Sequence, residues 1–326
     1  MCTSISYYTD NSKLFGRNLD LEYSFGEHVV ITPRNYDFNF KFNSCDEHYA
    51  LMGIAFANDG YPLYFDAMNE HGLGMAGLNF PGNANYRSED DGIFYAFQVA
   101  SYEFIPWILR QCKTVEDVKS LLVGTIITDK SFNKKLPPTP LHWMVSDEKN
   151  SIVIEQGHGG IRTYDNPVGV LTNNPTFDRQ LFNLNNYMSL SCDPPKRKFS
   201  PKLDFDEYSR GMGAIGLPGD LSSMSRFVRA SFVKMNSVSD DGEEESVSQF
   251  FHILKSVEQQ RGCVRLDGKY EITQYTSCYN LIYNKMYYTT YDNSQINAVS
   301  MDRENLDGSS IIQIPMMREM NFNYQN

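Results

Sequence analysis

Short stretches in which apolar and polar positions alternate recur along the chain, and this period of two predicts strands. The first stretch, Thr3–Tyr8, is rich in β-forming residues and leads into the turn-forming segment Asp10–Ser12. Lys13–Asn18 then predicts a second strand. The chain is therefore expected to open with a β-hairpin that carries Cys2 at its tip.

Two later regions predict further antiparallel strands. Leu141–Ser146 and Ser151–Glu155 flank a polar turn and are expected to form a second hairpin. Near the carboxyl end, three strand-like runs separated by polar turns predict a closing meander. These runs are Cys278–Tyr283, Met286–Tyr291 and Ile296–Met301.

Three segments show helical periodicity instead. Thr114 and Asp117 have the spacing of a capping box ahead of Val118–Leu122. Ser246 and Gln249 have the same spacing at the start of a second apolar stripe, and a third stripe precedes it in the chain. The second stripe consists of Val247, Phe250, Phe251, Leu254 and Val257, and the third of Met224, Phe227, Val228, Phe232 and Met235.

The remaining pattern defines loops and the fold class. The polar stretch Ser237–Glu245 and the proline-containing stretch Thr128–Pro140 are expected to be exposed loops. Runs of strands and runs of helices are segregated, which favours a layered α+β single domain over residues 1–326. No stretch approaches 18 apolar residues, and the start of the chain lacks the pattern of a secretory signal. Membrane insertion and secretion are therefore not predicted.

The charge balance restricts the partners. The chain has 29 Lys and Arg residues against 40 Asp and Glu residues, which gives a net charge of −11, and it has no long basic run. Nucleic acid and an anionic membrane surface are disfavoured, because both bind through many cationic contacts. A small, mostly apolar anion is not excluded, because a local cation in a pocket is enough to bind it.

Six cysteines lie at positions 2, 45, 112, 192, 263 and 278. None forms a CxxC pair or lies near a histidine at metal-ligand spacing, so we expect reduced thiols and no metal site. Cys2 has a further property if Met1 is removed, because it then carries both a thiol and a free α-amine. Their ordinary pKa values, about 8.5 and about 7.7–8.0, let the amine accept the thiol proton, as in N-terminal nucleophiles.

Four polar residues are candidates to assist Cys2. Arg17 and Asp20 return beside it on the second strand, where a guanidinium favours a thiolate and a carboxylate can orient the amine. The alternative for this pair is an ordinary surface ion pair. Asn79 and Asn173 each follow a strand-like run, and their side-chain N–H groups suit an oxyanion site. Turn formation explains the two asparagines equally well.

Short segments along the whole chain carry a further signal: MCTS, FGRNLDLEYSFGE, ITPRNY, NEHGLGMAGLNFPG, LHWMVSD, GVLTNNPTFD, GLPGD followed by SRFVRA, QFFHIL, QYTSCYN and TTYDNSQINA. In this order they resemble the choloylglycine hydrolase family, which contains the bile salt hydrolases and the penicillin V acylases. The resemblance implies an N-terminal nucleophile hydrolase fold, a four-layer αββα sandwich with two stacked antiparallel sheets. It also implies a cytoplasmic bacterial enzyme, removal of Met1, no cofactor and a homotetramer.

The resemblance also implies roles for individual residues. Cys2 matches the nucleophile, Arg17 the arginine beside it, and Asp20 the aspartate that orients the amine. Asn79 and Asn173 match the asparagines around the oxyanion and scissile amide. Asn at position 79 is typical of bile salt hydrolases, whereas penicillin V acylases have Tyr there. The second active-site arginine and the apolar substrate-binding residues match Arg226, Leu19, Phe25, Phe132 and Leu136.

The activity implied is hydrolysis of the amide that joins a bile acid to glycine or taurine, through a thioester on Cys2. A penicillin V acylase-type amidase with the same machinery is one alternative. A catalytically silent bile-acid-binding protein on the same fold is the other, although retention of all six site residue types argues against it.

Overall fold

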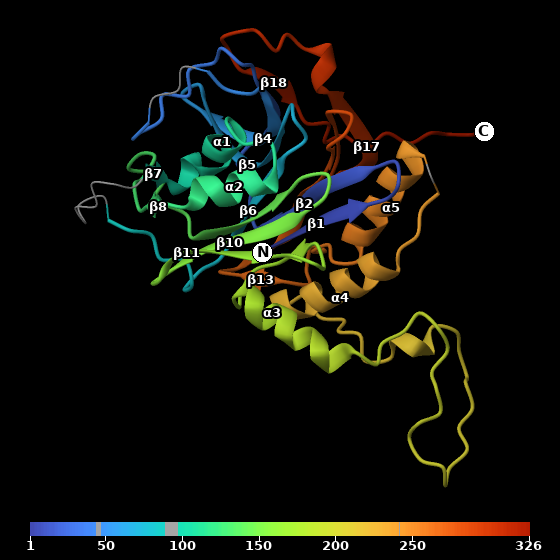
Figure 1. The fold of residues 1–326 in the computed structure, drawn as a ribbon. Helices are drawn as coiled ribbons and strands as arrows, with labels where there is room; N and C mark the ends of the chain where they lie inside the picture. The colour runs from blue at the N-terminus through green and yellow to red at the C-terminus, as the bar shows by residue number, and fades with distance from the viewer. Residues whose placement is uncertain (44–46, 89–96, 241) are drawn as a thin grey trace.

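The computed structural model describes residues 1–43, 47–88, 97–240 and 242–326, and two antiparallel sheets form its centre (Figure 1). The six-stranded sheet has the order β12 (Val170–Leu171), β1 (Cys2–Tyr8), β2 (Lys13–Leu21), β15 (Ile272–Asn280), β16 (Lys285–Thr290) and β17 (Asn293–Ser300). The eight-stranded sheet has the order β11 (Gly160–Asp165), β10 (Ser151–Gly157), β9 (Leu141–Ser146), β6 (Gly74–Asn79), β5 (Tyr61–Asn69), β4 (Leu51–Asn58), β3 (His28–Thr32) and β18 (Ile312–Pro315).

Helices cover the outer face of each sheet. α1 (Phe104–Leu109) and α2 (Val115–Leu122) lie on the eight-stranded sheet, and α4 (Ser223–Asn236) and α5 (Glu243–Lys255) lie on the six-stranded sheet. The predicted αββα layers are therefore present. The shorter elements are β7 (Phe97–Ala100), β8 (Thr125–Thr128), α3 (Phe177–Asn183), β13 (Arg265–Leu266), β14 (Lys269–Tyr270) and the 3₁₀ turns Ser101–Glu103, Leu184–Tyr187, Met212–Ala214 and Met301–Arg303.

Strand β3 shows how the sequence builds two cores. Val29 and Ile31 point to the six-stranded sheet, whereas Val30 points to the helix layer that contains Trp107. Successive side chains of a strand face opposite sides, so a strand buried on both faces reads as a continuous apolar run. This explains why the middle of the sandwich is harder to recognise from alternation than its edges.

The first hairpin forms as predicted, but Cys2 does not lie at its tip. The turn is closed by the hydrogen bond from the Thr9 N–H to the Ser12 carbonyl (2.9 Å), at the far end of the strands. Cys2 pairs with Leu19 at the open end. The prediction was wrong because the first residue of an antiparallel pair must lie opposite the turn.

The predicted helices need one further correction. The capping box of Thr114 and Asp117 is present ahead of α2. Ser246, in contrast, lies inside α5, which begins at Glu243 after the N-cap Gly242. Three glutamates in the first turn of α5 complement the positive end of the helix dipole, so the sequence Glu243–Glu245 is helix and not loop.

Predicted boundaries also moved in two other places. The second predicted hairpin is β9 and β10, and the meander is β15 to β17, but β15 begins six residues earlier than expected, at Ile272. In α4 the apolar stripe is narrower than predicted, because Met224 and Met235 are 38% and 61% exposed.

A long segment over residues 188–222 projects away from the layers between α3 and α4, and we call it the arm (Figure 1). Six of its large apolar side chains are exposed. They are Met188, Phe199, Leu203, Phe205, Tyr208 and Ile215. Over the described ranges, no helix has the length and apolar character that crossing a membrane requires.

Candidate active site

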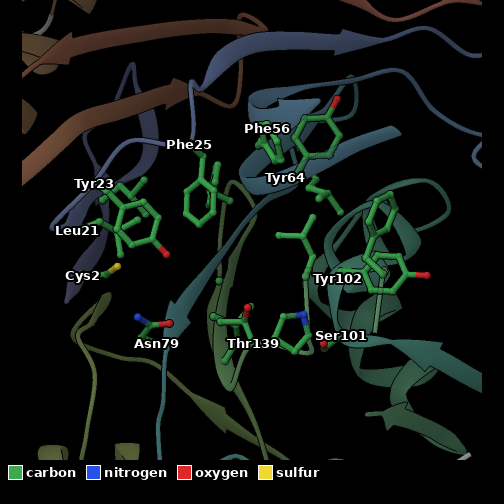
Figure 2. A pocket seen from close by; sticks show the side chains of 18 of the residues that line it. Cys2, Leu21, Tyr23, Phe25, Phe56, Tyr64, Asn79, Ser101, Tyr102 and Thr139 are labelled. Carbon is green, nitrogen blue, oxygen red and sulfur yellow. The ribbon is translucent and has the colours of Figure 1, made fainter. Parts of the chain in front are cut away.

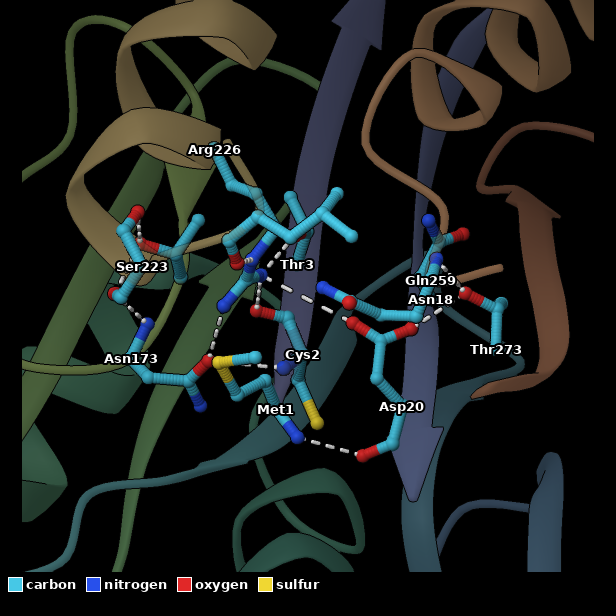
Figure 3. A network of polar contacts seen from close by, with 12 residues as sticks. Met1, Cys2, Thr3, Asn18, Asp20, Asn173, Ser223, Arg226, Gln259 and Thr273 are labelled. Carbon is cyan, nitrogen blue, oxygen red and sulfur yellow. Dashed lines mark hydrogen bonds and ion pairs between the residues drawn. The ribbon is translucent and has the colours of Figure 1, made fainter. Parts of the chain in front are cut away.

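Cys2 begins β1, the second strand of the six-stranded sheet, which lies between the edge strand β12 and β2. Its backbone N–H donates to the side-chain oxygen Oδ1 of Asn173 (2.9 Å). Its carbonyl accepts from Nη1 of Arg226 (2.6 Å). The residue is only 2% exposed, and two residues distant in sequence, Asn173 and Arg226, hold its backbone (Figure 3).

Asn173 follows β12, and hydrogen bonds fix both its side chain and its backbone. Its Oδ1 also accepts from Nη2 of Arg226 (2.8 Å), and its Nδ2 donates to the carbonyl of Asn79 (2.8 Å). Its backbone N–H donates to Oγ of Ser223 (2.9 Å), the first residue of α4. A side-chain amide with this many partners has one orientation, with nitrogen toward Asn79 and oxygen toward Cys2.

Arg226 on α4 is fully buried and links the helix layer to the hairpin. Besides Cys2 and Asn173, its guanidinium donates to the hydroxyl of Thr3 and lies 4.0 Å from Oδ2 of Asp20. Burial lowers the pKa of Arg226, and the Asp20 carboxylate opposes that shift. A buried cation of this kind is tolerated because hydrogen-bond acceptors and a carboxylate surround it.

Asp20 in β2 is fully buried behind Cys2. Its Oδ1 accepts from the hydroxyl of Thr273 (2.6 Å), whereas Oδ2 has no hydrogen-bond partner among the residues that the structure describes. Burial raises the pKa of Asp20, and the amino-terminal ammonium and Arg226 oppose that effect. One carboxylate oxygen of Asp20 is therefore buried without a hydrogen bond to the described residues, with the Arg226 guanidinium 4.0 Å away.

Arg17, three residues earlier in β2, is also fully buried. Its Nη1 donates to the carbonyls of Phe65 (3.2 Å) and Gly77 in the facing sheet, and within the described ranges Nη2 has no partner. Burial alone would lower the pKa of Arg17, but the anionic forms of neighbouring groups, Cys2 foremost, outweigh it and raise that pKa. Arg17 and Cys2 line the same cavity.

Asp66, a second buried carboxylate near Arg17, was not predicted. It lies in β5 and accepts from the hydroxyls of Ser277 (2.7 Å), Tyr279 (2.6 Å) and Tyr275. Burial raises the pKa of Asp66, and Arg17 opposes the shift. Its signal in the sequence is a carboxylate inside the apolar run of β5 (YPLYFDAMN), where a charge needs a partner.

Met1 occupies the position in front of Cys2, so the Cys2 nitrogen is part of a peptide bond here. Met1 continues the pairing of β1 with β2: the Asp20 N–H donates to its carbonyl (3.0 Å) and its ammonium donates to the Asp20 carbonyl (2.7 Å). The ammonium also forms an ion pair with the buried carboxylate of Glu271. Nothing in the sequence pattern pointed to Glu271, which lies just before β15.

A cavity of about 430 Å³ opens beside Cys2 (Figure 2). In this view Cys2 and Asn79 lie at one end, and Ser101 and Tyr102 at the other. Leu19, Phe25, Phe132 and Leu136, the four apolar residues predicted to bind substrate, all line it. The other lining residues are Arg17, Leu21, Tyr23, Phe56, Leu63, Tyr64, Phe65, Gly77, Lys135, Pro137, Thr139 and Leu141.

The two sides of this cavity differ in chemistry. One side, which we call the thiol end, consists of Cys2, Arg17 and Asn79, with Asp20, Asn173 and Arg226 around them. The other, the apolar wall, consists of the four predicted apolar residues with Phe56 and Phe65.

Within the apolar wall, Phe25 contacts Phe65 and Phe56 at ring-centroid distances of 5.5 and 5.9 Å. Phe132 contacts Tyr102 at 5.1 Å. The stretch Thr128–Pro140, predicted to be an exposed loop, therefore contributes half-buried residues to this wall.

Other predictions concern cysteines and metals. Five of the six cysteines are described and have free thiols, and Cys45 lies outside the described residues. In the part of the chain that the structure describes, no group of three or more His, Cys, Asp or Glu side chains is arranged to hold a metal ion.

The two stacked antiparallel sheets between helix layers are the fold expected of the N-terminal nucleophile hydrolases, and comparison with known proteins specifies the class. Residues 2–314 match the model of the linear amide C–N hydrolases, choloylglycine hydrolase family. The chain belongs to this family and is an amide C–N hydrolase.

Curated relatives and solved structures agree. A bile salt hydrolase/transferase from Lactiplantibacillus plantarum is 53% identical over 99% of both chains, and one from Clostridium perfringens is 40% identical over 100% of both. The structure of a mutant conjugated bile acid hydrolase from Clostridium perfringens superposes over 100% of both chains with a TM-score of 0.91 at 39% identity.

A penicillin V acylase structure from Agrobacterium tumefaciens gives a TM-score of 0.75 at 20% identity, over 96% of this chain and 91% of that one. At this identity the likeness concerns the fold alone. Together with the previous match it confirms the N-terminal nucleophile hydrolase fold predicted from the sequence.

Proposed function

We propose that this protein hydrolyses the amide bond between a bile acid and glycine or taurine. The observation that carries the proposal is the cavity itself, which has a thiol, a guanidinium and an asparagine at one end and an apolar wall along its length. A conjugated bile salt has the matching form, with a large apolar steroid and one anionic group beyond the amide. The names of the similar bacterial enzymes support the same substrate class.

In the proposed reaction, removal of Met1 first frees the α-amine of Cys2. The Cys2 thiolate then attacks the amide carbonyl, and the Cys2 α-ammonium protonates the leaving amine. The carbon–nitrogen bond breaks and a thioester remains. The same amine, now neutral, takes a proton from a water molecule, and the resulting attack releases the free bile acid and restores the thiol.

The surrounding residues have separable roles in this proposal. Asn79 and Asn173 donate to the oxyanion; Nδ2 of Asn173 has two N–H groups and Asn79 uses one of them. Arg17 stabilises negative charge on the sulfur. Asp20 offers its carboxylate oxygen Oδ2 to the amine, and Arg226 positions Asn173 and the Cys2 carbonyl.

The net charge of −11 does not conflict with an anionic substrate. Repulsion by a whole surface is screened over about 8 Å at physiological ionic strength, whereas a charge inside the cavity interacts with its immediate neighbours. Arg17 and Arg226 place two buried guanidinium groups around Cys2. The apolar wall supplies most of the contact area for the steroid.

The test is a comparison of rates for glycocholate, taurocholate and penicillin V, with release of glycine, taurine or the β-lactam nucleus as the readout. We expect rapid release from the two bile salts and slow release from penicillin V. Faster turnover of penicillin V would support the acylase alternative. Glycocholate binding without glycine release by the unlabelled protein, when a thiol reagent labels Cys2 stoichiometrically in a parallel sample, would support a silent binding protein.

We also propose that the chain is one domain, forms a homotetramer and resides in the bacterial cytoplasm. The exposed apolar residues of the arm support a subunit contact, because an isolated surface rarely exposes so many. The free thiols of the described cysteines are typical of a reducing compartment. Light scattering during gel filtration measures the mass of the oligomer. Substituting Phe199 and Tyr208 by Asp should lower this mass below that of four chains. A parent protein with the mass of one chain would refute the homotetramer.

A further inference from the structure

His142 in β9 connects the two segments that carry Asn79 and Asn173, and no step of the proposed reaction uses it. Its imidazole is fully buried and stacks on the ring of Phe80, the residue after Asn79, with 4.1 Å between the ring centroids and 8° between the ring planes. Its Nε2 lies 2.9 Å from the carbonyl oxygen of Thr172, the residue before Asn173. One side chain therefore contacts both of the segments that present a proposed oxyanion donor.

The hydrogen bond to Thr172 has a fixed direction. A backbone carbonyl can only accept, so Nε2 of His142 is the donor. The other ring nitrogen, Nδ1, lies 3.3 Å from Oε1 of Glu155, and that oxygen also accepts from the backbone N–H of Phe177 (2.9 Å). Glu155 is buried and Phe177 begins α3, so this carboxylate orients the imidazole and anchors the far end of the segment 172–177.

The peptide group between Thr172 and Asn173 is held at both of its polar atoms. His142, in the eight-stranded sheet, donates to its carbonyl, and Oγ of Ser223 in α4 accepts from its N–H (2.9 Å; Figure 3). Asn79 ends β6, the strand that pairs with β9. His142 thus links the sheet that carries Asn79 to the strand end of the other sheet that carries Asn173.

Burial of a histidine between acceptors does not by itself indicate such a role, as His48 shows. Each of its ring nitrogens lies 2.7 Å from a backbone carbonyl oxygen, and its ring contacts Phe38 at a centroid distance of 4.9 Å. None of these partners adjoins a residue of the thiol end in sequence. His142 differs in the position of its partners, which are the sequence neighbours of Asn79 and Asn173.

We propose that His142 is a positioning residue of the oxyanion site, which holds Asn173 in line with Asn79 so that both donate to one oxyanion. The inference rests on the oxyanion role of these asparagines in the proposed function. A donor is effective only within about 2.7–3.1 Å of the developing charge, so a shift of the segment after β12 should slow the chemical step. Substrate binding by the apolar wall should be unaffected.

His142→Phe is the principal test, because a phenyl ring preserves the stacking on Phe80 but has no N–H group for Thr172. We expect kcat for glycocholate to fall at least about tenfold and KM to change less than about twofold. Alkylation of Cys2 by iodoacetamide forms no oxyanion. Its rate, followed by mass spectrometry of the amino-terminal peptide, should therefore stay within about twofold of the parent rate.

His48→Phe is the matched control, since it removes the same ring nitrogens from a buried histidine outside the cavity. It should leave kcat unchanged. An equal loss of kcat in the His48 and His142 variants would overturn the proposal. Alkylation of Cys2 slowed as much as kcat in His142→Phe would also overturn it, because the defect would then lie at the thiol.

A double substitution decides whether His142 acts through Asn173. Asn173→Ala removes the amide that His142 is proposed to position, so adding His142→Phe should lower kcat by less than about twofold more. A residue that only stabilises the fold would lower kcat by the same factor in both backgrounds. An equal loss in both backgrounds, or a parental kcat for His142→Phe alone, would overturn the positioning role.

If His142→Phe fails to fold, two amide variants decide the question in its place. In His142→Gln the amide nitrogen reaches the position of Nε2, whereas in His142→Asn it reaches only that of Nδ1. We expect the glutamine variant to have at least about fivefold higher kcat, the equivalent of one hydrogen bond. Equal kcat values in the two variants would overturn the proposal.

The outcome is separable from that of the proposed function. A parent protein that releases glycine from glycocholate, with His142→Phe at the parental kcat, refutes the positioning role alone. A parent that cleaves penicillin V but no bile salt refutes the proposed substrate alone, and the same variants are then compared on penicillin V. A parent that cleaves neither substrate refutes both.

Discussion

The two sides of the cavity are built on opposite principles. The thiol end comes from strands and a helix, and its polar atoms are tied to one another across more than 200 residues of sequence, as in the contact from Arg226 to Cys2. The apolar wall comes from loops and strands in equal part: Phe25, Phe132 and Leu136 lie in loops. Leu19, Phe56 and Phe65 lie in β2, β4 and β5. Its members contact one another through rings and not through directed bonds.

This difference predicts which side tolerates change. A buried polar group that loses its partner remains desolvated without a compensating hydrogen bond, so the thiol end should tolerate few substitutions. Apolar contacts scale with area and have weak directionality, so the wall can change shape with moderate loss. We therefore expect substitutions at the thiol end to abolish chemistry, and substitutions in the wall to change which substrate is bound.

The largest effect should follow from Cys2→Ala. Removal of the nucleophile is expected to lower kcat for glycocholate by roughly 10⁴-fold or more. Cys2→Ser should also be severely impaired, because a hydroxyl is far less ionised than a thiol near neutral pH. Glycine release is the readout, and substrate binding by the inactive protein is the control. Retention of most activity in either variant would refute the assignment of Cys2.

Asn173→Ala should have the next largest effect. Loss of one oxyanion donor typically costs about 10²–10³ in kcat, and the circular dichroism spectrum should be unchanged. Asn174→Ala provides the control, because the neighbouring amide donates to Pro81 and not to the cluster around Cys2. A small effect at Asn173, or equal effects at both asparagines, would contradict the oxyanion role.

Much of the fold was predictable because local chemistry and tertiary structure agree. The first hairpin, the capping box of Thr114 and the final meander follow from alternation, turn residues and caps. The start of α5 was missed since the Ser246 spacing imitates a capping box, whereas three glutamates at a helix start satisfy the dipole. The beginning of β15 was missed because that strand is buried throughout and does not alternate.

The candidate site was only partly predictable. Cys2, Asp20 and Arg226 could be named because their types match a family pattern, and the structure brings them together. Asp66 and Glu271 belong to the same buried region, yet each acts through partners that no local spacing shows: three hydroxyl donors for Asp66, and the chain's own ammonium for Glu271. Such long-range electrostatic pairing becomes visible only once strands distant in sequence are adjacent.

A substitution in the apolar wall should produce a smaller and different change. Leu136→Ala shortens a half-buried side chain that lines the cavity, and we expect KM for glycocholate to rise about tenfold with little change in kcat. Leu203→Ala in the arm removes a 59% exposed leucine and should leave both constants unchanged. A fall in kcat at constant KM would mean that Leu136 acts on the chemistry.

The smallest effect concerns a half-buried cation outside the thiol end. Lys234 lies on α4, as Arg226 does, but among the described residues its ammonium hydrogen-bonds to the carbonyl of Val168 (2.6 Å) and meets no carboxylate. Burial lowers the pKa of Lys234 to about 8. The pKa of a lysine in an unfolded chain is about 10.4. Between the folded and the unfolded pKa of Lys234, the unfolded state therefore binds more protons than the folded state.

The free energy of unfolding should therefore include a contribution that rises from about pH 8 to about pH 10 and is absent at lower pH. Lys234→Met should remove this contribution to the slope and stabilise the protein at pH 7, with turnover unchanged. Urea unfolding of parent and variant at pH 7, 8, 9 and 10 measures the difference. The buried tyrosines, whose pKa values are raised, contribute equally to the free energy of unfolding of both proteins, so their contribution cancels in the difference. Parallel pH profiles would show that the ammonium of Lys234 is solvated in the folded protein and that its pKa is not lowered.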